Sequence, residues 1–69
     1  MIGSIRTLRV DKGFGFITSD GPGSMEFFFH RSAVRGTSFE NLRVGATVEF
    51  EEEASTKGPR ARDVRVEEV

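Results

Sequence analysis

The sequence contains no cysteine and only one histidine. Without cysteine the chain can form neither disulfide bonds nor thiolate zinc sites. A single histidine makes a metal centre of nitrogen and sulfur ligands a poor hypothesis, so we expect no metal and no other cofactor. The lack of disulfides fits a reducing compartment, and the expected location is the cytoplasm.

Long apolar runs are also missing. Apolar stretches are only a few residues long, whereas a membrane-spanning helix needs about 20 such residues. The segment 1–4 has neither the charged nor the apolar region of a signal peptide. We therefore expect no association with a membrane.

Residues of like charge cluster only in short segments of the chain, and the net charge is −1. This balance argues against a protein that binds polyanions by bulk charge alone. Arg6, Arg9 and Lys12 lie near the first aromatic run, so a local basic patch is compatible with the composition. The later run 51–53 is all glutamate, but no apolar pocket is evident to set one carboxyl pKa apart for acid–base catalysis. We expect no enzyme.

The 69 residues predict one small domain, 1–69, that buries about 60% of its unfolded surface. Period-two alternation and turn residues predict strands over 2–10, 14–19, 25–30, 46–51 and 60–66. Ile5 is out of phase with Ile2 and Leu8, which indicates a bulge in the first strand. A single 3₁₀ turn is expected over 31–34, with Val34 in the core, and a loop over 35–45. Glu49 and Glu51 are expected to pair with Arg60 and Arg62 across the last two strands. These elements predict an all-β, five-stranded antiparallel barrel.

Two short stretches carry most of the aromatic residues. In Lys12-Gly13-Phe14-Gly15-Phe16-Ile17, strand alternation places Phe14 and Phe16 on one face. In the stretch 27–30, Phe28 and His30 share a face. Because the other faces can line the core, we expect these four side chains to point outward together. We call them the aromatic platform: Phe14, Phe16, Phe28 and His30. Framed by Lys12 and Arg31, such a cluster is typical of surfaces that stack unpaired bases.

Both stretches resemble motifs of the bacterial cold-shock proteins. The stretch 12–17 is similar to the first ribonucleoprotein-type motif of that family, and Phe27-Phe28-Phe29-His30 to the second. Ser32-Ala33-Val34, Phe39 and Lys57-Gly58-Pro59 extend the resemblance over about residues 3–66. It implies a Greek-key OB-fold barrel that binds single-stranded RNA or DNA. It also implies that Phe39 stacks a base and that Arg6, Lys12 and Lys57 make basic contacts, although Phe39 could instead pin its loop to the barrel.

Three positions depart from the family pattern. The family usually has Trp-Phe where this chain has Thr7-Leu8, and Phe where it has Arg31. Each aromatic stack contributes roughly 1–3 kcal/mol to binding. The missing rings are therefore expected to lower the affinity, unless Arg31 stacks in place of one of them. The leading hypothesis is a monomeric, ATP-independent RNA chaperone with effects on transcription and translation. The alternative is a protein-interaction barrel whose nucleic-acid surface has decayed.

Overall fold

The computed structural model describes residues 1–20, 23, 25–53, 56 and 58–67. Its strands are β1 (Ile2–Arg9), β2 (Phe14–Ser19), β3 (Glu26–His30), β4 (Thr47–Glu53) and β5 (Arg60–Val66). Two one-turn 3₁₀ helices, η1 (Arg31–Ala33) and η2 (Phe39–Asn41), lie between β3 and β4. None of the described helices is long and apolar enough to span a membrane. The predicted all-β class and the single turn after β3 are confirmed, whereas η2 was not foreseen and β4 extends two residues beyond its expected end.

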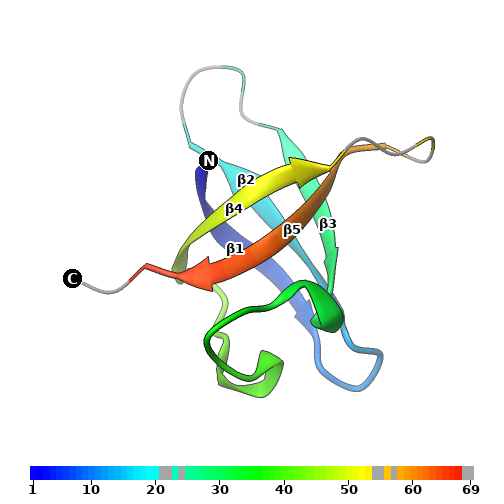
Figure 1. The fold of residues 1–69 in the computed structure, drawn as a ribbon, viewed down its shortest axis with the longest axis vertical. Coiled ribbons are helices and arrows are strands. Elements are labelled where there is room, and N and C mark those ends of the chain that lie inside the picture. Colours follow the sequence, from blue (N-terminus) through cyan, green and yellow to red (C-terminus); the bar gives the residue numbers. More distant parts are fainter. Residues whose placement is uncertain (21–22, 24, 54–55, 57, 68–69) are drawn as a thin grey trace.

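The strands close into a barrel in the order β1-β2-β3-β5-β4 (Figure 1). Neighbouring strands run antiparallel, except that β3 and β5 are parallel and meet at one residue pair, Phe28 and Arg60. An isolated parallel bridge between Val34 and Val64 continues this junction. The predicted five-stranded barrel is thus confirmed, and it departs from a strictly antiparallel arrangement at one junction because the long β3–β4 connection brings the last strand beside the third in the same direction.

Alternation along the strands separates the core from the surface. The side chains with almost no exposure come from every strand, and they are Ile5, Ile17, Phe27, Phe29, Val48, Phe50 and Val64. Phe27 stacks at a tilt on Phe50, with ring centroids 5.1 Å apart. The intervening residues of β2 and β3 are turned outward, as the alternation predicts.

The first hairpin contains two local devices. The register of β1 against β2 shifts between Ile5 and Thr7, so the predicted bulge is present and Arg6 is the extra residue. In β2, a Cβ on Gly15 would lie 2.6 Å from the carbonyl oxygen of Thr7 and 2.9 Å from Cε1 of Phe29. Only glycine permits this close approach of β1 and the Phe29 ring.

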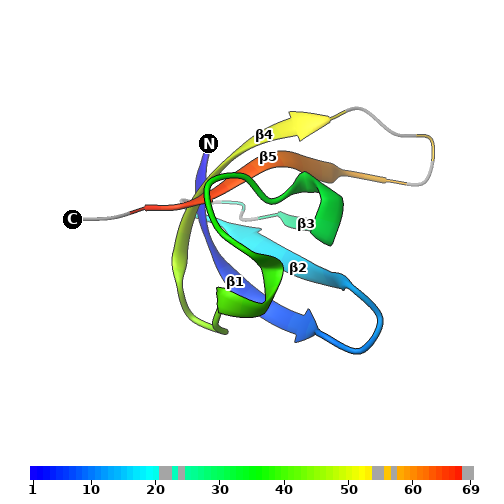
Figure 2. The ribbon, with the colours of Figure 1, turned by 60° about the horizontal axis from the view of Figure 1, so that its bottom comes forward.

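The connection between β3 and β4 crosses one open end of the barrel (Figure 2). It inserts Val34, Phe39 and Leu42 into the core. Phe39 is only 4% exposed, and its ring centroid lies 6.0 Å from that of Phe29. The connection thus closes the bottom of the core, and Val34 is buried as predicted.

Candidate nucleic-acid interface

The three phenylalanines of the aromatic platform form one contiguous, half-buried surface. Phe14 and Phe28 have ring centroids 5.6 Å apart and are tilted by 34°. Phe16 stands edge-on to both, at 6.1 Å from Phe14 and 5.7 Å from Phe28. These are favourable distances for aromatic pairs, so the rings support one another while part of each remains open to solvent.

Strand register explains why the rings meet. Phe14 lies opposite His30, and Phe16 lies opposite Phe28, on the outward face of β2 and β3. Directly opposite side chains have Cβ atoms about 4.5–5.5 Å apart. The two neighbouring strands therefore bring the platform together, as the sequence predicted for these four positions.

The Phe16–Phe28 pair belongs to a row that crosses four strands. Thr7 of β1 lies opposite Phe16, and Arg60 of β5 lies opposite Phe28. The Arg60 guanidinium carbon is 5.3 Å from the Phe28 ring centroid, within the range of a cation–π contact. Arg60 was expected only on a solvated face beside glutamates, because nothing in the local pattern pairs the last strand with β3. The predicted closed barrel is the one sequence signal for this contact, because closure requires a second neighbouring strand for β3.

The turn between β1 and β2 places cations at one end of the platform. The Arg31 backbone N–H donates to the carbonyl oxygen of Gly13 at 2.8 Å. Gly13 has a φ of 75°, and a Cβ there would lie 3.1 Å from Cδ of Arg31. The missing side chain lets the Arg31 stem pack against the turn, which also carries the exposed Lys12. Arg31 and Lys12 thus both lie at the turn that leads into Phe14 of the platform.

His30 is oriented by the helix that it caps. The Ser32 backbone N–H donates to Nδ1 of His30 at 3.2 Å, and the Ser32 hydroxyl lies 3.0 Å from the same nitrogen. Since Nδ1 accepts a hydrogen bond, the neutral ring carries its proton on Nε2. The imidazole is exposed and fixed at the edge of the platform, beside Phe14.

Two further basic residues, Arg6 and Lys57, were predicted to contact the nucleic acid. The Nε of Arg6 lies 3.5 Å from Oε2 of Glu26, and both side chains are exposed. Exposed pairs of this kind contribute only about 0–1 kcal/mol, so a phosphate can compete for Arg6. Lys57 lies outside the described residues.

The expectation for Phe39 requires a correction. Its ring packs in the core against Phe29 and has no open face for a base. The sequence could not predict whether Phe39 faces inward, because the β3–β4 connection has no regular alternation of apolar and polar residues. Phe39 therefore has the alternative role, which is to pin the loop to the barrel.

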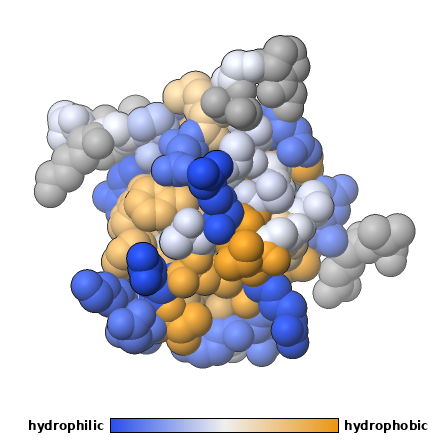
Figure 3. All heavy atoms as spheres, turned by 180° about the vertical axis from the view of Figure 1, so that it is seen from behind, coloured by the Kyte–Doolittle hydropathy of each residue, from blue (hydrophilic) through white to orange (hydrophobic). Residues whose placement is uncertain are grey.

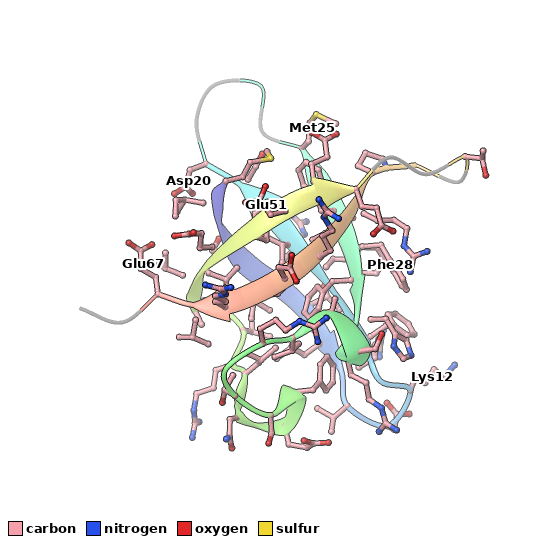
Figure 4. All side chains as sticks on the ribbon, viewed as in Figure 1. Lys12, Asp20, Met25, Phe28, Glu51 and Glu67 are labelled. Carbon is pink, nitrogen blue, oxygen red and sulfur yellow. The ribbon has the colours of Figure 1, made fainter. Side chains whose placement is uncertain are left out.

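Acidic and basic residues face each other on the strands away from the platform. Phe28 and Lys12 lie on one side of the molecule and Glu67 on the opposite side (Figure 4). The view from behind, onto β1–β3, shows apolar surface bordered by strongly hydrophilic side chains (Figure 3). On the other strands, Glu49 lies opposite Arg65, Glu51 opposite Arg62 and Glu53 opposite Arg60. Glutamates and arginines thus do face each other, but only the Glu51–Arg62 pairing matches the predicted partners.

A family model described as the 'Cold-shock' DNA-binding domain matches residues 1–67. The chain belongs to this cold-shock domain family. Cold shock-like protein CspC of Escherichia coli K12 is 44% identical over 62 residues, which cover 90% of this chain and 88% of the relative. Probable cold shock protein A of Mycobacterium tuberculosis is 41% identical over 63 residues, 91% of this chain and 92% of the relative. Cold shock protein 1 of Lactiplantibacillus plantarum is 40% identical over 62 residues, 90% and 91% of the two chains. This cold-shock domain is a nucleic-acid-binding protein of the cold-shock type.

Proposed function

We propose that the chain binds single-stranded RNA or DNA by stacking unpaired bases on the aromatic platform. The observation that carries this proposal is the set of three partly exposed phenylalanine rings, 5.6–6.1 Å apart, in register on β2 and β3. These half-buried rings leave part of their apolar surface in water. A base that covers such a ring removes apolar surface from water and adds a stacking contact of roughly 1–3 kcal/mol.

The geometry favours single strands over duplexes. Bases in a duplex already cover each other's faces, so a platform of rings gains contacts only with bases that are unstacked. The platform also offers ring faces and few hydrogen-bond donors, since His30 is its only polar member. We therefore propose a weak sequence preference, because every base has a stacking face.

The cations beside the platform position the sugar–phosphate backbone of the nucleic acid. Lys12 lies in the β1–β2 turn, Arg31 of η1 packs against that turn, and Arg60 lies over the Phe28 ring. Arginine can pair with a phosphate and also stack on a base. Arg31 can thus replace part of the missing family ring.

We further propose that the protein acts as an RNA chaperone without ATP. Many weak stacks hold RNA segments unpaired and thereby disfavour hairpins, which requires no energy source beyond binding. Effects on transcription and translation follow if such hairpins control them. The closed strand order leaves no open barrel edge among the described strands, so a second copy has no strand to extend, and we propose a monomer.

Fluorescence anisotropy with labelled oligo-dT and oligo-U, each with its duplex as a control, tests the binding. Phe28→Ala should lower the affinity for single strands by roughly 1–3 kcal/mol. Val44→Ala is a matched control, because Val44 is an exposed apolar side chain on the η2–β4 connection and not part of the platform. Absence of binding to either single strand would instead favour the protein-interaction barrel. Melting of a fluorophore-labelled RNA hairpin by the protein alone tests the chaperone activity.

A further inference from the structure

A polar groove of about 340 Å³ lies between η1 and β5. His30 and Arg60 line it, and both residues also belong to the edge of the platform. His30 is the outermost member of the platform on β3, and Arg60 covers the Phe28 ring. The groove therefore begins where the platform ends on its β5 side.

Three arginines and two acidic residues line the groove: Arg35, Arg60, Arg62, Glu53 and Asp63. Arg35 is already engaged, since its Nε donates to Oδ1 of Asp63 at 3.3 Å and its Nη1 to the Ser32 carbonyl oxygen at 3.4 Å. This contact neutralises Asp63 and ties η1 to β5.

Arg60 and Arg62 are the cations that remain available. Over the described ranges the ion pairs are Arg6–Glu26 and Arg35–Asp63, so neither Arg60 nor Arg62 has a carboxylate within pairing distance there. The two residues are separated by one buried residue, Ala61, and both are exposed. Along a strand they lie about 6.6 Å apart, and they present two guanidinium groups in sequence from the platform into the groove.

We propose that this groove is a phosphate subsite for a nucleic-acid strand that leaves the platform, with Arg60 and Arg62 as its donors. The inference rests on the proposed function, because the strand must first be stacked on the platform. The sugar–phosphate backbone of a stacked base lies beside the ring and not on it, so the next phosphate needs a partner at the platform edge. Guanidinium groups bind phosphate oxygens through paired N–H donors. The Nε2–H of His30 adds a third donor at the mouth of the groove.

The test compares oligo-dT of about 4 and about 8 nucleotides, which span the lower range of site sizes for one OB-fold. Binding of each to the wild-type chain, Arg62→Ala, Arg62→Lys and Arg65→Ala is measured by anisotropy over a salt series. Arg65→Ala is the matched control, since Arg65 lies on the same strand, faces a glutamate as Arg62 does, and does not line this groove.

For the longer oligonucleotide, we expect Arg62→Ala to weaken binding about threefold to tenfold at low salt and to reduce the log–log salt slope by about 0.7, the value for one lost phosphate contact. The shorter oligonucleotide should be unaffected, Arg62→Lys should restore part of the loss, and Arg65→Ala should resemble the wild type. Equal effects of Arg62→Ala and Arg65→Ala, or equal effects on both lengths, would overturn the subsite while leaving platform binding intact. If the wild-type chain binds neither oligonucleotide, the proposed function itself fails. Unchanged thermal midpoints of the variants show that the losses are not due to unfolding.

Discussion

Replacing Thr7 by tryptophan should strengthen binding, because Thr7 occupies the β1 place in the four-strand row, where the family usually has a ring. The bulge at Arg6 turns Thr7 to the same face as Phe16, directly opposite it. A tryptophan there extends the sequence of rings from Phe28 through Phe16 onto β1. The face of residue 7, which the irregular first strand left undetermined in the sequence, is thus fixed by the register.

The expected magnitude follows from two opposing terms. One further base stack contributes roughly 1–3 kcal/mol, whereas immobilising a large side chain costs about 0.5–1.5 kcal/mol. The midpoints of these two ranges leave a net gain of about 1 kcal/mol, and each 1.4 kcal/mol corresponds to about a tenfold change in Kd. Affinity for oligo-dT should therefore rise about fivefold. Threonine and tryptophan both favour strands, so the thermal midpoint should change little.

The assay is favoured by the composition, since the natural chain contains no tryptophan and no tyrosine. The introduced indole is then the sole strong fluorophore, and a base that stacks on it quenches its emission. Thr47→Trp is the matched control, because Thr47 is an exposed strand residue on β4, outside the platform. The reasoning is refuted if Thr7→Trp leaves affinity and emission unchanged on titration, or if Thr47→Trp gives the same gain.

Four further outcomes are expected. Phe29→Ala should lower the free energy of unfolding by about 3–5 kcal/mol, as seen in urea denaturation, and a benign effect there combined with unfolding by Phe28→Ala would show that the two faces are inverted. Phe39→Ala should likewise reduce stability while the folded fraction keeps its affinity for oligo-dT; a loss of affinity at unchanged stability would contradict its place in the core. The affinity of the wild-type chain should fall with salt with a log–log slope of about −1.4 to −2.8, corresponding to about 2–4 phosphates, and a much steeper slope in anisotropy titrations would mean that charge dominates over stacking. Asp63 has a φ of 51°, a region that costs most residues about 1–2 kcal/mol, so Asp63→Ala should lower the urea midpoint more than Asp63→Asn does; the reverse order would rule out backbone strain as the cause.

The parts of the fold that could be predicted are those in which neighbouring residues constrain each other. Alternation in β2 and β3 correctly placed Phe27 and Phe29 inside and Phe16 and Phe28 outside, because a strand has only two faces. The out-of-phase Ile5 indicated a bulge for the same reason. Gly15 is a signal of the same local kind, since a glycine inside a strand often marks a close approach of another segment.

The parts that could not be predicted depend on contacts between distant segments. Phe39 begins the one-turn helix η2, which is too short to show a period that would determine whether the ring faces the core or the solvent. The contact of Arg60 with the Phe28 ring requires the parallel junction of β3 and β5, and that junction is a consequence of barrel closure. Glu49 was expected to face Arg60 or Arg62, but a register shift between Glu49 and Glu51 places Arg65 opposite it.

The narrow junction between β3 and β5 has a consequence for how the barrel moves. One residue pair joins these strands, and one isolated bridge joins Val34, which follows η1, to β5, whereas β2 and β3 share five pairs. We therefore expect the barrel to open most easily at this junction, and amide hydrogens beside it should exchange before those of the β2–β3 ladder. If a nucleic-acid strand binds along the row from Thr7 to Arg60 as proposed, it crosses this junction and holds the two strands together. Binding would then favour the closed barrel, and opening of the junction would favour release.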